Sequence, residues 1–116
     1  DLTAGKIYRV ENHGEIDFGG GERNDAKISE IEPKLRDPED DYGWWELEKG
    51  TYLLEFNERL KENKIAFLQP LSRLTRNSAT HPSGFVESLE LVPLQVGENG
   101  ISIKDNARTS RLVIIE

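Results

Sequence analysis

The stretch "YLLEFNERLKENKIAFL", residues 52–68, decides the fold, because its leucine spacing suits either one amphipathic helix or two strands joined by a turn. Gly50 and Thr51 precede the stretch, and "ENK" (62–64) interrupts it. β-Branched and aromatic residues flank the interruption, which favours strands over a helix. We therefore predict two strands with a turn between them.

Short apolar segments of the same kind recur along the whole chain. They are "KIYRV" (6–10), "EIDF" (15–18), "KISEIE" (27–32), "TYLLEFN" (51–57), "KIAFLQPL" (64–71), "LELVPLQV" (89–96), "GISI" (100–103) and "RLVIIE" (111–116). Glycine and Asx residues lie between them, as in "LEKGT", "GENG" and "KDNA", where the backbone must reverse. This spacing is typical of an all-β barrel or sandwich.

Length and composition restrict the class of protein. With 116 residues, the chain is predicted to form a single domain over residues 1–116. No apolar run approaches the roughly 20 residues of a membrane span, so we expect no membrane partner. The absence of cysteine excludes disulfides and cysteine-ligated zinc and fits a cytoplasmic location. The net charge of −7 argues against nucleic-acid binding.

The acidic segment "KLRDPEDDYGWWELEKG", residues 34–50, is predicted to be an exposed loop that leads into a strand. Trp44 and Trp45 lie at the end of this loop, and two interpretations are open. They form an aromatic platform for a base or sugar, or at least one is buried and anchors the loop on the barrel or a neighbouring subunit. The tract "DFGGGE" (17–22) lacks the Gly-Lys-Ser/Thr ending of a phosphate-binding loop, and we predict a hairpin there.

The stretch "QPLSRLTRNSATHPSG", residues 69–84, concentrates arginine, histidine and hydroxyl side chains between two apolar runs. Hydroxyl groups and guanidinium forks in a turn suit a polyphosphate. A second polar segment near the C-terminus contains Arg108 and Arg111. A small anion could therefore find a positive pocket on a chain that is acidic as a whole.

Four segments, in this order, resemble motifs of the dUTPase and dCTP deaminase superfamily. They are "DLTAGKIYRV" (1–10), "WELEKGTYLLEFNE" (45–58), "PLSRLTRNSA" (70–79) and "NARTSRLVII" (106–115). The first resembles the family's Asp-Leu at the head of a strand, and the others are similar to L-x-P-G-x-Y-x-L, R-S-S-L-x-R-x-G-A and G-A-R-I-A-Q-L-V-F. The resemblance implies a β-clip, a distorted jelly-roll barrel, and a homotrimer that builds its sites at subunit interfaces.

The resemblance also implies the substrate-binding residues. Ser72 and Arg76 match the first serine and the second arginine of the triphosphate-binding signature. Arg73 replaces its second serine and could supply the guanidinium that is missing at Leu71. Arg108 matches the arginine of the closing motif, where it contacts phosphate or pairs with a carboxylate across subunits. The implied ligand is a pyrimidine deoxynucleotide, with Mg²⁺ bound through its phosphates and no zinc.

The family's general base is a carboxylate on the hairpin after this turn, where the sequence has only the shorter "THPSGFVES" (80–88). No aspartate lies between residues 57 and 100. The remaining candidate catalytic residues are Glu87 and Glu90, which we expect on one face of a strand, and His81, whose pKa is ordinarily near neutrality. The structural interpretations are a solvent-facing strand edge for the two glutamates and a surface loop for His81.

Three functions follow. The first is a dUTPase-related, deoxynucleotide-handling protein that, if active, hydrolyses dUTP to dUMP and pyrophosphate. We expect this activity to be weak or absent, because loss of a positioned general base costs ~10²–10⁴ in rate. The alternative is a non-catalytic nucleotide-binding or structural trimer, so whether the chain is an enzyme stays open. A dCTP deaminase is the third choice, because Val92 lies near the position where the resemblance places the glutamate of the deaminases.

Overall fold

The computed structural model describes residues 1–115, which form ten strands and one helical turn. The strands are β1 (Leu2–Val10), β2 (Ile28–Glu30), β3 (Trp44–Leu47), β4 (Gly50–Phe56), β5 (Ala66–Pro70), β6 (Ala79–Thr80), β7 (Gly84–Val86), β8 (Val92–Val96), β9 (Ile101–Lys104) and β10 (Arg108–Ile114). The helical turn is α1 (Ser72–Thr75). Within residues 1–115, no helix is long and apolar enough to cross a bilayer. The prediction of an all-β fold is confirmed.

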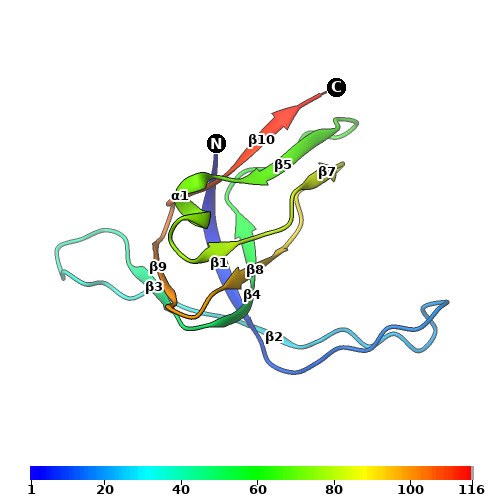
Figure 1. The fold of residues 1–116 in the computed structure, drawn as a ribbon, viewed down its shortest axis with the longest axis horizontal. Coiled ribbons are helices and arrows are strands. Elements are labelled where there is room, and N and C mark those ends of the chain that lie inside the picture. The colour runs from blue at the N-terminus through cyan, green and yellow to red at the C-terminus, as the bar shows by residue number, and fades with distance from the viewer. Residues whose placement is uncertain (116) are drawn as a thin grey trace.

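The main sheet curls into a half-barrel (Figure 1). Its strand order is β6-β8-β4-β1-β10-β5-β7, with β2 paired to the end of β1, while β3 and β9 form a separate two-stranded sheet. Strand β1 pairs with β10 at its start and with β4 along the rest. Register shifts between Leu2 and Thr3 and between Ala4 and Lys6 lie where the partner changes, and such irregularities bend a strand. This curled sheet agrees with the β-clip that the resemblance implies.

The residues that decide the fold form β4 and β5, as predicted. In β4, Tyr52, Leu54 and Phe56 are buried and the residues between them are less buried, the period of two expected of a strand. Ile7 of β1 and Leu94 of β8, on the two strands that flank β4, are completely buried. The apolar core therefore lies on the inner face of the curled sheet.

The two adjacent tryptophans have different environments. Trp45 is buried, and its Nε1 donates a hydrogen bond to the carbonyl oxygen of Ile31 at 2.7 Å. Trp44 is half-buried, and the guanidinium carbon of Arg36 lies 3.8 Å from the centroid of its ring. The exposed loop before β3 and the burial of one tryptophan at its end confirm the prediction for this segment.

The connection between β1 and β2 forms an arm, residues 11–27, that extends away from the barrel (Figure 1). At its far end the side chains of Ile16 and Phe18 are 91% and 105% exposed. The carboxylate of Asp17 accepts hydrogen bonds from the backbone N–H groups of Gly20 and Glu22 at 2.6 and 2.8 Å. The strand predicted over residues 15–18 is wrong, because this local turn replaces pairing with a neighbouring strand.

Shortening the arm is expected to change the stability of the fold very little. Glu15 and Asn24 exchange two backbone hydrogen bonds, of 2.7 and 2.9 Å, and such a pair can be closed by a two-residue turn. We expect replacement of residues 16–23 by Asn-Gly to change the free energy of unfolding by less than about 1 kcal/mol, because no core contact is lost. Urea denaturation measures the change, and a loss above about 2 kcal/mol would show that the arm supports the barrel.

Candidate functional site

A groove of about 440 Å³ lies beside α1, along β9 and the start of β10. Arg73 of α1, Lys104 of β9 and Arg108 of β10 line it, and none of the acidic residues within 1–115 does. Trp44 and Asn77 are also part of the lining. The structure therefore brings together two of the four predicted substrate-binding residues, Arg73 and Arg108, which lie in different motifs of the sequence.

Local hydrogen bonds fix the backbone from which these arginines project. The backbone N–H of Leu71 donates to the carbonyl of Thr109 at 2.9 Å, which joins the start of α1 to β10. Leu74 is buried and holds α1 against the core, while Nδ2 of Asn77 donates to the carbonyl of Arg73 at 2.7 Å. The guanidinium of Arg73 is exposed, and within residues 1–115 neither it nor that of Arg108 forms an ion pair.

The charge of this groove distinguishes it from larger hollows of the surface. Two hollows of about 860 and 810 Å³ have more acidic than basic side chains in their linings. The smaller groove has three cationic side chains and an aromatic one, so it is the better place for an anion. The chain as a whole carries a net charge of −7, so the cluster of positive charge in this groove is not a consequence of the overall composition.

The other two predicted phosphate ligands lie outside this groove. Ser72 and Arg76 are exposed, and neither belongs to the groove lining. Ser72 is the first residue of α1, and Leu71, which precedes it, caps the turn without a side-chain hydrogen bond. Ser78 stands where the family signature has glycine, and its φ of 82° is in the left-handed region that glycine favours. The turn therefore has the backbone conformation of a glycine despite the serine.

Glu87 and Glu90 lie in the connection between β7 and β8, and both are exposed. The expectation that they share one face of a strand is wrong. Strand β7 is at one end of the sheet and β8 is near the other, so residues 87–91 must cross between them without pairing. Glu90 lines the hollow of about 810 Å³, and that lining has no residue in common with the groove of Arg73 and Arg108.

His81 is buried, so the surface-loop position that we expected for it is wrong. Its Nε2 lies 2.7 Å from Oγ of Ser110, and its Nδ1 lies 2.9 Å from the carbonyl oxygen of Pro82. The carbonyl must accept, so Nδ1 carries the proton and Nε2 accepts the hydroxyl proton of Ser110. The ring also meets Phe56 edge-on, with centroids 6.2 Å apart. Nε2 joins the segment after β6 to β10, whereas the hydrogen bond of Nδ1 to Pro82 is local.

Acid is expected to destabilise the fold through His81. Burial lowers the pKa of His81, and the hydrogen bond to Pro82 opposes this only in part. The folded pKa therefore lies below the unfolded value of about 6.5. The stability contributed by the neutral ring is complete above about pH 6.5 and is lost as the pH falls toward the folded pKa, by at most about 1.4 kcal/mol per pH unit.

Urea denaturation between about pH 5 and about pH 8 measures this loss. The double variant His81→Leu/Ser110→Ala removes both partners of the buried hydrogen bond and should flatten the pH dependence in this range. His13, on the exposed arm, provides the matched control, and His13→Asn should leave the dependence unchanged. Equal slopes in the double variant and the unaltered protein would contradict the assignment.

The motif comparison missed Lys104 as a groove residue. Lys104 lies opposite Trp44 in the antiparallel pair of β3 and β9, and these strands are far apart in the sequence. The available signal was its place four residues before Arg108, at the end of the "ISIK" strand. This position predicts a groove residue only when the pairing of β3 with β9 is known.

Comparison with other proteins supports the family that the motifs indicate. No protein-family model matches the chain. A "Probable deoxyuridine 5'-triphosphate nucleotidohydrolase" of Archaeoglobus fulgidus is 30% identical over 122 residues, which cover 99% of this chain and 68% of the relative. A "Deoxyuridine 5'-triphosphate nucleotidohydrolase" of Methanocaldococcus jannaschii is 31% identical over 123 residues, which cover 100% and 74%. With similarity over its whole length, an all-β curled sheet and the motif order described above, the chain belongs to the deoxyuridine 5'-triphosphate nucleotidohydrolase (dUTPase) family.

Proposed function

We propose that this chain is a dUTPase-related protein that binds the phosphates of a pyrimidine deoxynucleotide in the groove of Arg73 and Arg108. The observation that carries the proposal is that two arginines from separate motifs line one groove, and that no acidic side chain of the described residues, 1–115, lines it. Guanidinium forks without an internal carboxylate partner suit phosphate oxygens. The choice of dUTP follows the names of the two archaeal relatives.

In this proposal hydrolysis is weak or absent. Water attack on a phosphate needs a positioned base, and no carboxylate in the part of the chain that the structure describes lines the groove. Glu90, a predicted base, lines a separate hollow, and Glu87 lines neither. His81 is buried with both ring nitrogens hydrogen-bonded. Within residues 1–115, none of these three candidate bases therefore belongs to the groove.

The proposal includes a homotrimer with sites between subunits, as the family resemblance implies. Ser72 and Arg76 are exposed beside the groove without lining it, so in a trimer they would serve a nucleotide shared with the next subunit. Mg²⁺ would be held by phosphate oxygens, because within residues 1–115 no group of three or more His, Cys, Asp or Glu side chains is placed to hold a metal. Light scattering tests the trimer, and a monomer at micromolar concentration would contradict it.

Isothermal titration with dUTP, dCTP and dUMP in the presence of Mg²⁺ tests the proposed function. Triphosphates should bind more tightly than dUMP, because the cationic groove contacts the phosphates beyond the first. Pyrophosphate release is then measured on the same samples and should be slow or undetectable. Equal affinities for dUTP and dUMP, or no binding, would contradict the proposal, whereas rapid release from dUTP would favour a fully active hydrolase.

A further inference from the structure

One of the cationic side chains of the groove, Lys104, already forms an ion pair within the chain. Lys104 and Trp44 are direct partners across β9 and β3, and both line the groove. The Nζ atom of Lys104 lies 2.9 Å from Oδ2 of Asp40 and 5.7 Å from the centroid of the Trp44 ring. Asp40 itself is not part of the groove lining. A carboxylate from outside the groove therefore neutralises one of its three cations.

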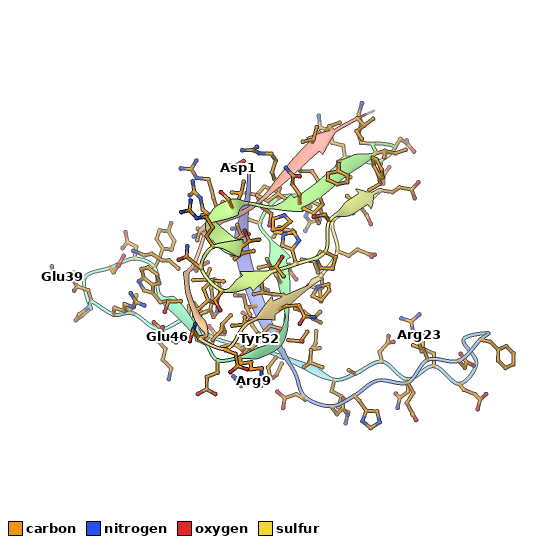
Figure 2. The ribbon with its side chains drawn as sticks, viewed as in Figure 1. Asp1, Arg9, Arg23, Glu39, Glu46 and Tyr52 are labelled. Carbon is orange, nitrogen blue, oxygen red and sulfur yellow. The ribbon has the colours of Figure 1, made fainter. Side chains whose placement is uncertain are left out.

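Asp40 belongs to the acidic loop, residues 35–42, that precedes β3. Two backbone hydrogen bonds between Lys34 and Trp44, of 2.9 and 2.8 Å, close the base of the loop. Figure 2 shows the loop projecting from the barrel, with Glu39 at its far end and Glu46 where the chain has returned to the sheet. In the outer half, the backbone N–H of Asp40 donates to the carbonyl of Asp37 at 3.0 Å.

The pair of Asp40 and Lys104 is more sheltered than a usual surface ion pair. The two side chains are 29% and 35% exposed, whereas those of Glu98 and Lys49, which also form a pair, are 80% and 63% exposed. The hydrogen bond from Lys104 holds the pKa of Asp40 below its usual range, so Asp40 is ionised at neutral pH. Reduced solvent screening makes this the stronger attachment of the two.

We propose that Lys104 is a third phosphate-binding residue of the groove and that Asp40 competes with phosphate for it, so that nucleotide binding releases the outer part of the loop, residues 37–42. The inference rests on the proposed function and adds a regulatory element to the same site. A polyphosphate carries more negative charge than one carboxylate and is held at the same time by Arg73 and Arg108. It therefore displaces Asp40 from Lys104 and releases residues 37–42, while Arg36 keeps its hydrogen bonds to Glu46 at the base of the loop.

Titration calorimetry with a non-hydrolysable dUTP analogue and with inorganic tripolyphosphate tests the competition. Asp40→Asn should tighten the binding of both probes about two- to fivefold, the size expected for one partly exposed ion pair. Glu98→Gln removes the same charge from the Lys49 pair and should leave both affinities unchanged. Lys104→Met should weaken binding about tenfold, whereas its matched control Lys49→Met should not.

Hydrogen exchange of residues 37–42 provides a readout that does not depend on affinity. Exchange in the unaltered protein should rise when the analogue binds, and in free Asp40→Asn it should already be raised. If the analogue binds but Asp40→Asn and Glu98→Gln have equal affinities and loop exchange is unchanged, the competition is disproved and the proposed function stands. If neither probe binds the unaltered protein, the proposed function fails and this inference fails with it.

Discussion

Replacement of Trp45 by alanine is expected to lower the free energy of unfolding by about 3–5 kcal/mol, the range for removal of a buried tryptophan. The side chain is only 2% exposed, so its loss leaves a cavity in the core. It also leaves the carbonyl oxygen of Ile31 without the 2.7 Å hydrogen bond from Nε1. Both effects act in the same direction, and their sum approaches the whole stability of an ordinary domain of this size.

The neighbouring residue provides the control. Trp44 is half-buried and stacks with Arg36 on the surface, so Trp44→Ala should lower the free energy of unfolding less than Trp45→Ala does, by about 1–2.5 kcal/mol. Trp45→Phe keeps much of the volume but loses the Nε1 donor and should fall between the two. Urea denaturation measures all three variants. Equal losses for the two alanine variants would contradict the assignment of Trp45 as the anchor.

The parts of the fold that could be predicted from the sequence are those with a local signal. The alternation of Tyr52, Leu54 and Phe56 gives a period of two that requires no knowledge of partners, and β4 has that form. The tryptophan pair carries enough apolar area to require burial of at least one ring, which is the case for Trp45. The segment of residues 15–18 has the same local pattern but no neighbouring strand that would cover it.

The errors concern residues whose position depends on distant segments. His81 follows a short strand and resembles a loop residue, but it is buried, and the hydroxyl of Ser110, 29 residues away, donates a hydrogen bond to its Nε2. Glu87 and Glu90 lie near two strands in the sequence, but the sheet order separates those strands and leaves the glutamates in a crossing. Neither fact can be read from spacing along the chain.

The residues of the candidate site also fall into two groups, those that a local motif predicts and those that only the fold brings together. Arg73 and Arg108 could be chosen because each matches or neighbours a family motif, and the structure places them in one groove. Asp40 and Lys104 are 64 residues apart, and only the pairing of β3 with β9 brings them together. The roles of Ser72, Arg76, Glu87 and Glu90 remain predictions, because a single chain does not bring them to this groove.

Removal of both groove arginines should have the largest effect on ligand binding. Arg73→Ala/Arg108→Ala is expected to weaken the binding of dUTP by at least about 100-fold, because each charge-assisted hydrogen bond contributes about 1.5–3 kcal/mol and each 1.4 kcal/mol is a factor of about ten. Both side chains are exposed, so the thermal midpoint should stay within about 2 °C of that of the unaltered protein. Titration calorimetry measures the affinity, and the loss should be smaller for dUMP, which has fewer phosphates to contact.

The matched control is Arg23→Ala/Arg59→Ala, which removes the same charge from the arm and from the β4–β5 connection. Neither residue lines the groove, so the affinity for dUTP should change less than about twofold at physiological salt, where distant charges are screened. Equal losses in the two double variants would mean that dUTP responds only to net charge. Ser72→Ala and Arg76→Ala extend the test, because unchanged affinity in both would remove these residues from the binding site and leave the groove of Arg73 and Arg108 as the whole of it.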